Sequence, residues 1–271
     1  MQSRVSLFKV PGGDTIQLLK TKEALERLGH RVGLSLETTP VLTGYDLVHL
    51  FNLTRPQEIY LQMRNAKQKG RKVVLSTIYV SYLEYERMGR TGLARIIANS
   101  LKPHHLEYLK VLARAVKNGE IHLGTVYLLF KGYRGAQLEV LSGVDVSLPN
   151  SQSEMDRVVR DFLLQEYPPY VVVPNGVDLS IFNADPLEIS PEVKKFRNCV
   201  LSVGRIEGRK CQLSLVRALK DLPYQLVLIG KPAPNHQAYF EQIEKEATDQ
   251  VHILGEVEHE MLPQYYKFMP W

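Results

Sequence analysis

Cysteine is scarce in this chain of 271 residues, in which only Cys199 and Cys211 are present. Two cysteines form no disulfide framework, and their spacing matches no zinc-ligand pattern. We therefore expect both to be reduced thiols that fill small apolar spaces. No cluster of acidic residues replaces the missing sulfur ligands, so we expect neither a metal ion nor another cofactor.

Long hydrophobic runs are also missing. No apolar segment approaches the roughly 20 residues needed to span a bilayer. The opening residues, MQSRVSLFKVPGG, contain too few apolar side chains for a signal peptide. These absences predict a cytoplasmic protein. With 44% hydrophobic and 23% charged residues, the composition is that of an ordinary globular protein. The length allows one large domain or two modest ones.

Positive charge is present but unevenly distributed. Residues 1–175 contain 23 Lys and Arg against 16 Asp and Glu, whereas residues 176–271 contain 11 against 13. A basic first part suits phosphorylated substrates, an anionic membrane or nucleic acid. No nucleic-acid-binding motif is visible, so we expect no nucleic-acid partner. The apolar and basic stretch Arg87–Lys102 suggests peripheral docking on an anionic membrane; alternatively, this helix packs on its own domain with solvated cations.

Short apolar runs alternate with helical patterns in the first part of the chain. The sequence predicts a helix from the turn at Gly12 to about Leu28, and another that opens with Pro56 at its favoured first position. Ser151 and Glu154 have the spacing of a capping box for a further helix. The predicted strands are Val5–Val10, Arg31–Leu36, Tyr45–Phe51, Lys72–Ser76, Val144–Leu148 and Tyr170–Val173. This alternation predicts an α/β fold with a parallel sheet.

A glycine turn connects the first predicted strand to the first helix. Gly12 and Gly13 would let the backbone approach a ligand closely, and Asp14 can cap the helix. An ordinary tight turn explains the same residues without a ligand.

The stretch Val200–Lys210, V-L-S-V-G-R-I-E-G-R-K, carries the clearest chemical signal. An apolar strand stops at Gly204, and a helical pattern begins just after Lys210. A helix N-terminus attracts anions, and a guanidinium with an ammonium would strengthen that attraction. Arg205 and Lys210 are therefore candidates for binding a diphosphate; alternatively, both are solvated loop charges. Two further strands, Gln225–Gly230 and Val251–Leu254, complete this part of the chain.

Three motifs taken together resemble a known family. The first is the Gly-Arg pair followed by Lys210. The other two are V-D-V-S-L-P-N-S at 144–151 and V-V-V-P-N-G-V-D at 171–178. Their order and spacing are similar to those of family-four (group 1) glycosyltransferases of the GT-B fold. The resemblance implies two Rossmann-like doubly wound domains and retaining transfer of a sugar from a nucleotide-diphosphate-sugar donor. It implies a saccharide or lipid-linked acceptor and a role in cell-envelope polysaccharide synthesis.

The resemblance also assigns domains and binding residues. Residues 1–178 would form the N-terminal, acceptor-side domain, 179–198 a proline-containing linker, and 199–271 a nucleotide-sugar-binding domain. Arg205 and Lys210 would hold the donor diphosphate without a metal ion. Gly12 and Gly13 would border the cleft, and Val257 would contact the nucleotide base through its backbone. No residue is assigned as catalytic.

One part of the family pattern is absent. The family's second domain has six strands and a pair of glutamates that contact the donor sugar and ribose, whereas only three strands and no such pair are visible here. The resemblance therefore implies a C-terminally truncated chain, incomplete in its second domain and without transferase activity alone. Two other functions stay open: a sugar-nucleotide epimerase of the same fold, and a non-catalytic nucleotide-sugar-binding or scaffold protein.

Overall fold

The computed structural model describes residues 1–9, 11–80, 123–183, 188–196, 199–233 and 236–269. It contains two compact units, Met1–Asn175 and Gly176–Trp271, which are described separately below. In the part of the chain that the structure describes, no helix is both long enough and apolar enough to cross a membrane.

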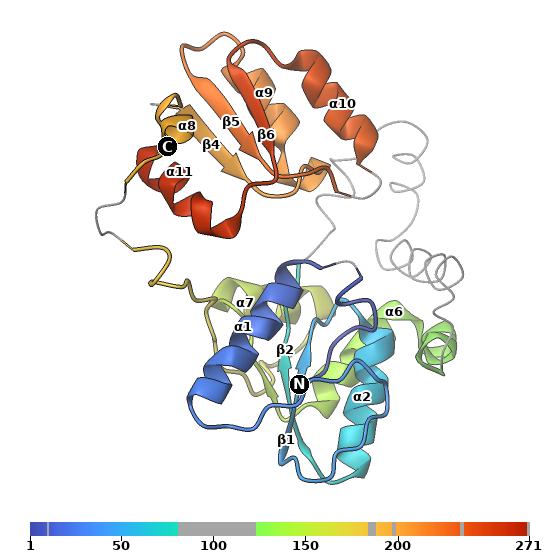
Figure 1. Cartoon of the computed structure of the whole chain (residues 1–271). Coiled ribbons are helices and arrows are strands. Elements are labelled where there is room, and N and C mark those ends of the chain that lie inside the picture. Colours follow the sequence, from blue (N-terminus) through green and yellow to red (C-terminus); the bar gives the residue numbers. More distant parts are fainter. Residues whose placement is uncertain (10, 81–122, 184–187, 197–198, 234–235, 270–271) are drawn as a thin grey trace. The chain divides into compact units, whose positions relative to one another are not determined.

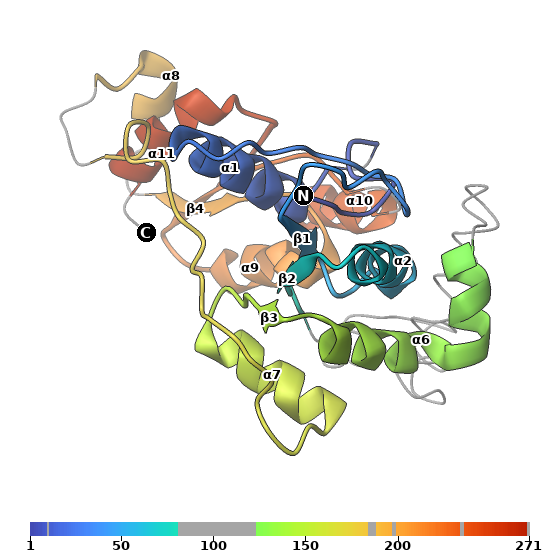
Figure 2. The same ribbon diagram turned by 90° about the horizontal axis from the view of Figure 1, so that it is seen from below.

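The first unit is built on a small parallel sheet (Figure 1). Strands β1 (Leu47–Phe51), β2 (Lys72–Ser76) and β3 (Val146–Ser147) lie in that order, with Leu47 opposite Lys72 and Val74 opposite Val146. The helices of the unit are α1 (Gly13–Arg27), α2 (Pro56–Gln68), α6 (Leu123–Gly143) and α7 (Gln152–Phe162). Helices α2 and α6 pack side by side (Figure 2).

Alternation along β1 separates two apolar clusters in this unit. Val48 and Leu50 pack in the main core with residues of α2, α6 and α7, whereas Phe51 packs with Leu7 and with Leu18 of α1. Successive side chains of a strand point to opposite faces, so α1 covers a different face from the main core. Both faces of the sheet are therefore buried, as expected for parallel strands.

Several predicted elements of the first unit are confirmed. Strand β2 has the predicted bounds, β1 and β3 lie inside the predicted ranges, and Pro56 is the first residue of α2. The Ser151 hydroxyl accepts the Glu154 backbone N–H at 3.1 Å, which confirms the N-cap of α7.

The predicted strand Val5–Val10 is wrong, because its described residues 5–9 form turns. The segment that pairs with β1 comes earlier: the Gln2 N–H donates to the His49 carbonyl at 2.8 Å, and the Phe51 N–H donates to the Gln2 carbonyl at 3.1 Å. Pairing is also shorter than predicted at Arg31–Leu36, where only Ser35 forms a bridge. At Tyr170–Val173 only Tyr170 forms a bridge, but backbone bonds continue along the predicted strand: the Val171 N–H donates to the Ser147 carbonyl at 2.9 Å, and the Val173 N–H donates to the Pro149 carbonyl at 2.8 Å.

Helix α6 was not predicted. Glycines at 124, 132 and 135 interrupt its pattern, and Gly132 is non-helical at φ +73°, where the helix kinks. Because glycine is unfavourable in helix interiors, the sequence of this segment did not predict a helix. The basic stretch Arg87–Lys102 proposed for membranes lies outside the described residues.

The second unit has three layers. Strands β4 (Cys199–Val203), β5 (Gln225–Ile229) and β6 (Val251–Gly255) form a parallel sheet in that order. Helices α9 (Gln212–Leu219) and α10 (Gln237–Glu246) pack on one face, and the short helices α8 (Pro191–Lys194) and α11 (Leu262–Phe268) pack together on the other (Figure 1). All three strands match their predicted ranges to within a residue.

Alternation along β5 produces this layering. Leu226 and Leu228 pack with residues of α9 and α10, whereas Val227 and Ile229 pack with residues of α8 and α11. Burial of each such side chain contributes about 1.5–3 kcal/mol relative to exposure. Both faces of the sheet therefore pack against apolar side chains of the helices.

The segment between the proposed domains contributes to the second unit. Val193 and Phe196, in and just after α8, are buried in the core beside Cys199. Burial raises the pKa of the Cys199 thiol. Cys211 is exposed instead, so the expectation that it fills an apolar space is wrong.

Candidate functional site at the carboxyl edge of the second sheet

The three parallel strands of the second unit each end at a glycine with positive φ. These are Gly204 at +144°, Gly230 at +143° and Gly255 at +72°. The Gly204 N–H donates to the Ile229 carbonyl at 2.8 Å, and the Gly230 N–H donates to the Gly255 carbonyl at 2.6 Å. The glycines thus form one continuous row at the carboxyl edge, which is where ligands bind in open parallel sheets.

Gly230 is needed at this edge for steric reasons. A Cβ added there would lie 2.1 Å from the Gly204 carbonyl oxygen, whereas one added at Gly255 would meet nothing within 4 Å. We expect Gly230→Ala to lower the free energy of unfolding of the second unit by about 2–3 kcal/mol, through the clash and the positive φ. Gly255→Ala, which carries only the strained φ, should cost about 1 kcal/mol. Urea unfolding of both variants tests this, and equal losses would contradict the close approach.

The chain that leaves β4 runs against the chain that leaves β5. The Ile206 N–H donates to the Lys231 carbonyl at 2.9 Å, and the Ala233 N–H donates to the Ile206 carbonyl at 3.0 Å. Ile206 is buried, while its neighbour Arg205 is exposed. The loop is therefore anchored through Ile206, and Arg205 is left at the surface of the edge.

Lys210 returns to the same edge. It lies in a 3-10 turn, Gly208–Lys210, that precedes α9, and an added Cβ on Gly204 would lie 4.0 Å from the Lys210 Cε. The structure therefore brings Lys210 beside Gly204 at the end of β4, the residue that precedes Arg205. Neither cation forms an ion pair with a carboxylate among the described residues. Both charged groups are exposed.

The neighbouring charges are used within the protein. The buried Glu207 carboxylate accepts the Arg209 guanidinium at 2.7 Å from Nη2, and Lys231 pairs with Glu256 across the ends of β5 and β6. Arg205 and Lys210 are thus distinguished from Arg209 and Lys231 by their lack of a described acidic partner.

The start of α9 differs from the prediction in one respect. Cys211 precedes the helix in the left-handed conformation at φ +59°, and the Leu213 N–H donates to the Tyr239 hydroxyl of α10 at 2.9 Å. One of the first amides of the helix is therefore already bonded within the protein. Tyr239 had no signal in the sequence, because it lies 26 residues from Leu213.

Val257 follows the last of the three glycines. Its side chain is half-buried and packs against the core formed with α8 and α11. Packing in this core therefore explains why an apolar residue stands at 257. The contact of its backbone with a nucleotide base stays a prediction.

In the first unit, Gly12 and Gly13 open α1. The Gly12 N–H donates to the Thr15 hydroxyl at 3.1 Å, and a Cβ on the exposed Gly13 would meet nothing within 4 Å. The space beside Gly13 is therefore open, and a residue with a side chain would also fit at this position.

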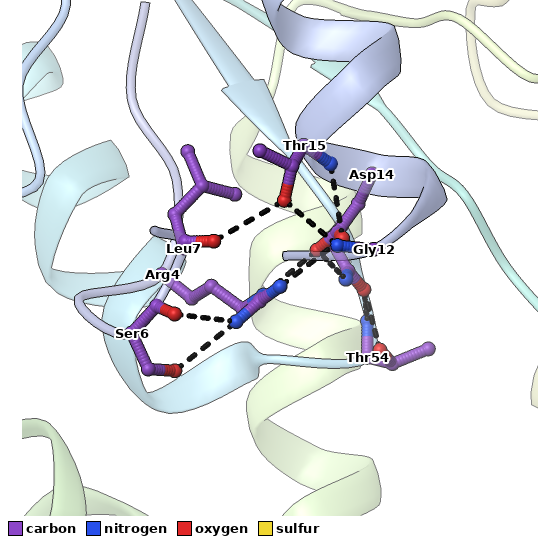
Figure 3. A network of polar contacts seen from close by, with 8 residues as sticks. Arg4, Ser6, Leu7, Gly12, Asp14, Thr15 and Thr54 are labelled. Carbon is purple, nitrogen blue, oxygen red and sulfur yellow. Dashed lines mark hydrogen bonds and ion pairs between the residues drawn. The ribbon is translucent and has the colours of Figure 1, made fainter. Parts of the chain in front are cut away.

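Asp14 does not cap this helix as predicted, because Gly12 is the N-cap and Asp14 lies inside the first turn. Its carboxylate instead accepts the Arg4 guanidinium at 2.8 and 3.2 Å, the Asn52 amide at 3.0 Å and the Thr15 N–H at 3.0 Å (Figure 3). Burial raises the pKa of Asp14, but the hydrogen bonds and charge of Arg4, with the Asn52 and Thr15 bonds, lower it overall. The network ties α1 to the end of β1.

Among the described residues, no group of three or more His, Cys, Asp or Glu side chains is placed to hold a metal ion. The carboxyl edge of the second sheet therefore offers positive charge and backbone amides. It carries an exposed guanidinium, an exposed ammonium and a row of glycines.

This architecture, an α/β fold with parallel sheets, matches solved GT-B glycosyltransferase structures. HepE (Alr3699) of Anabaena, solved in complex with UDP and glucose, aligns with a TM-score of 0.60 and 14% identity, over 99% of this chain and 71% of HepE. Sucrose-phosphate synthase from Thermosynechococcus elongatus aligns with a TM-score of 0.60 and 14% identity, over 95% of this chain and 68% of that enzyme. No protein-family model and no curated protein sequence matches the chain. The resemblance to the GT-B fold is thus confirmed.

Proposed function

We propose that this chain belongs to a retaining glycosyltransferase that moves a sugar from a nucleotide-diphosphate-sugar donor to a saccharide or lipid-linked acceptor in cell-envelope polysaccharide synthesis. Residues 199–271 would bind the donor, and residues 1–178 would face the acceptor. The observation that carries the proposal is the position of Arg205 and Lys210 at the end of β4, on the glycine-lined edge of the second sheet. The UDP and glucose bound to HepE support UDP as the first nucleotide to test.

The proposed chemistry follows from the charge that develops on the leaving group. When the bond between the sugar's anomeric carbon and the diphosphate oxygen breaks, the electron pair stays on the diphosphate. A guanidinium can bind two phosphate oxygens at once, and an ammonium adds a compact charge. Arg205 and Lys210 would therefore stabilise the departing diphosphate, which is electrostatic catalysis at the atoms where charge appears.

Other residues have supporting roles in the proposal. The Val257 backbone would contact the base, and Gly12 and Gly13 would contact substrate. The low cysteine content supports a reducing, cytoplasmic compartment, and the excess of Lys and Arg in residues 1–175 supports peripheral docking on an anionic inner leaflet.

Donor binding by the purified 271-residue chain tests the proposal, because the described edge carries the residues that it requires. The chain would be incubated with UDP-glucose labelled in the sugar, with and without saccharide and lipid-linked acceptors. We expect saturable retention that UDP displaces and uridine does not, since uridine lacks the diphosphate. Absence of any UDP-displaceable retention would contradict the proposal.

The same samples separate the other two functions. Conversion of the labelled nucleotide sugar into its epimer without an acceptor would identify an epimerase. Donor retention with neither transfer nor hydrolysis is expected both of a non-catalytic binding protein and of a transferase chain that is incomplete in its second domain. Transfer to any acceptor would exclude the non-catalytic function.

A further inference from the structure

The side chain of Gln212 spans the turn that carries Arg205. Gln212 is the first residue of α9, and only 2% of it is exposed. Its Nε2 donates to the Arg205 carbonyl at 3.0 Å, and its Oε1 accepts the Glu207 N–H at 3.4 Å. A single buried amide thus bonds to the backbone on both sides of Ile206.

The backbone bonds of these residues extend the connection to Lys210. Ile206 is held from the other side by the loop after β5, as described above. The Lys210 N–H donates to the Glu207 carbonyl at 2.8 Å. Gln212 therefore contacts the residue that carries the guanidinium and reaches the residue that carries the ammonium through one intermediate, Glu207.

We propose that Gln212 is a positioning residue for the diphosphate site, an inference that rests on the proposed function. It holds the backbone of Arg205 and Lys210 in one arrangement before the ligand arrives. Because the loop is then ordered in the unbound chain, binding does not have to supply that ordering.

The chemistry of the position explains why an amide is needed. The Arg205 carbonyl requires a donor and the Glu207 N–H requires an acceptor, and the primary amide of Gln212 supplies both from two separate atoms. Methionine has a similar length and no strong hydrogen-bonding group. Glutamate keeps the acceptor and, when ionised, lacks the donor.

The test compares Gln212→Met with a matched control in the same unit. Gln264 of α11 accepts the Ser190 N–H through its side chain at 2.8 Å, so Gln264→Met also removes a bond between a glutamine side chain and the backbone. UDP and UMP affinities are measured by calorimetry. Hydrogen exchange of residues 204–211 is followed without nucleotide.

In Gln212→Met we expect UDP affinity to fall about five- to tenfold, for loss of roughly one net hydrogen bond. UMP affinity should change less, because one phosphate uses fewer of the positioned cations. Exchange at 204–211 should become faster. Gln264→Met should leave the two affinities and this exchange unchanged. If Gln212→Met does not fold, Gln212→Glu keeps the size of the side chain and serves in its place.

Unchanged exchange at 204–211 would overturn the inference, as would an equal loss of UDP and UMP affinity. A wild-type chain that binds no UDP, with exchange that still rises in the variant, would count against the proposed function while leaving the loop contact established.

Discussion

Lys210→Ala and Arg205→Ala should each weaken UDP binding by about tenfold or more. A charge-assisted hydrogen bond contributes roughly 1.5–3 kcal/mol, and each 1.4 kcal/mol corresponds to about a tenfold change in affinity. Both cations are exposed and have no acidic partner among the described residues, so neither must break an ion pair there before it contacts a phosphate. The double variant should lose more than either single variant. Calorimetric titration with UDP measures all three.

The control for this prediction is Lys245→Ala. Lys245 is an exposed cation of the same unit in the last turn of α10, the turn that precedes the start of β6. It therefore lies towards the edge opposite to the candidate site, because the strands are parallel and the helix returns the chain. Its removal changes the net charge equally but should leave UDP affinity within about twofold, since exposed charges farther apart than a Debye length of about 8 Å are screened. Equal losses of UDP affinity in Lys245→Ala and Lys210→Ala would show that net charge, and not a site at Lys210, determines binding.

Asp14→Ala should destabilise the first unit by about 3–5 kcal/mol, the cost of breaking a buried ion pair by removing one partner. Arg4 is 5% exposed and its guanidinium donates twice to the Asp14 carboxylate. Without that carboxylate, a buried charge loses its counter-ion, and Asn52 and Thr15 each lose an acceptor. The loss should appear in the urea-unfolding transition of the first unit.

Helix α1 supplies the control for that measurement. Glu23 pairs with Lys20 at 2.9 Å on the surface, and more than half of each side chain is exposed. Glu23→Ala should therefore cost no more than about 1 kcal/mol. A cost for Asp14→Ala similar to that for Glu23→Ala would show that the buried network does not hold α1 in place.

The Asp14 pair also makes stability depend on pH in a defined direction. The folded-state pKa of Asp14 is lowered, so its contribution is complete above the unfolded-state pKa of about 3.9 and is lost as the pH falls through the folded-state value. Wild type should therefore lose more stability on acidification below about pH 4 than Asp14→Asn, whose side chain does not titrate. An equal loss of unfolding free energy below about pH 4 in the two proteins would contradict the lowered pKa of Asp14.

Much of the second unit could be predicted from the sequence because its signals are local. Each strand is a short apolar run that ends at a glycine, and Gly204, Gly230 and Gly255 mark the carboxyl edge directly. Arg205 and Lys210 follow one of those ends, so a parallel sheet places them at the same edge. The position of Arg205 and Lys210 at this edge was predictable because strand direction alone determined it.

The contacts around Asp14 in the first unit and around Arg205 in the second could not be predicted from the sequence. Arg4 resembles a surface charge in the sequence, and only the structure places it against Asp14. Likewise, only the structure pairs Gln2, two residues earlier, with β1. Gln212 fits a helical pattern whether or not its amide bonds to the turn, and Tyr239 reaches Leu213 from another helix. These are polar contacts, which leave no hydrophobic period in the sequence.

Hydrogen exchange of the wild-type chain with and without saturating UDP tests most directly whether the diphosphate binds at the carboxyl edge of the second sheet. Slower exchange is expected in the segments after β4 and β5, residues 204–211 and 230–233, because the bound phosphates would order both loops. In Arg205→Ala/Lys210→Ala the same nucleotide concentration should leave these segments unchanged. Protection confined to the first unit, or protection at 204–211 that survives in the double variant, would contradict the assignment of the donor site to Arg205 and Lys210.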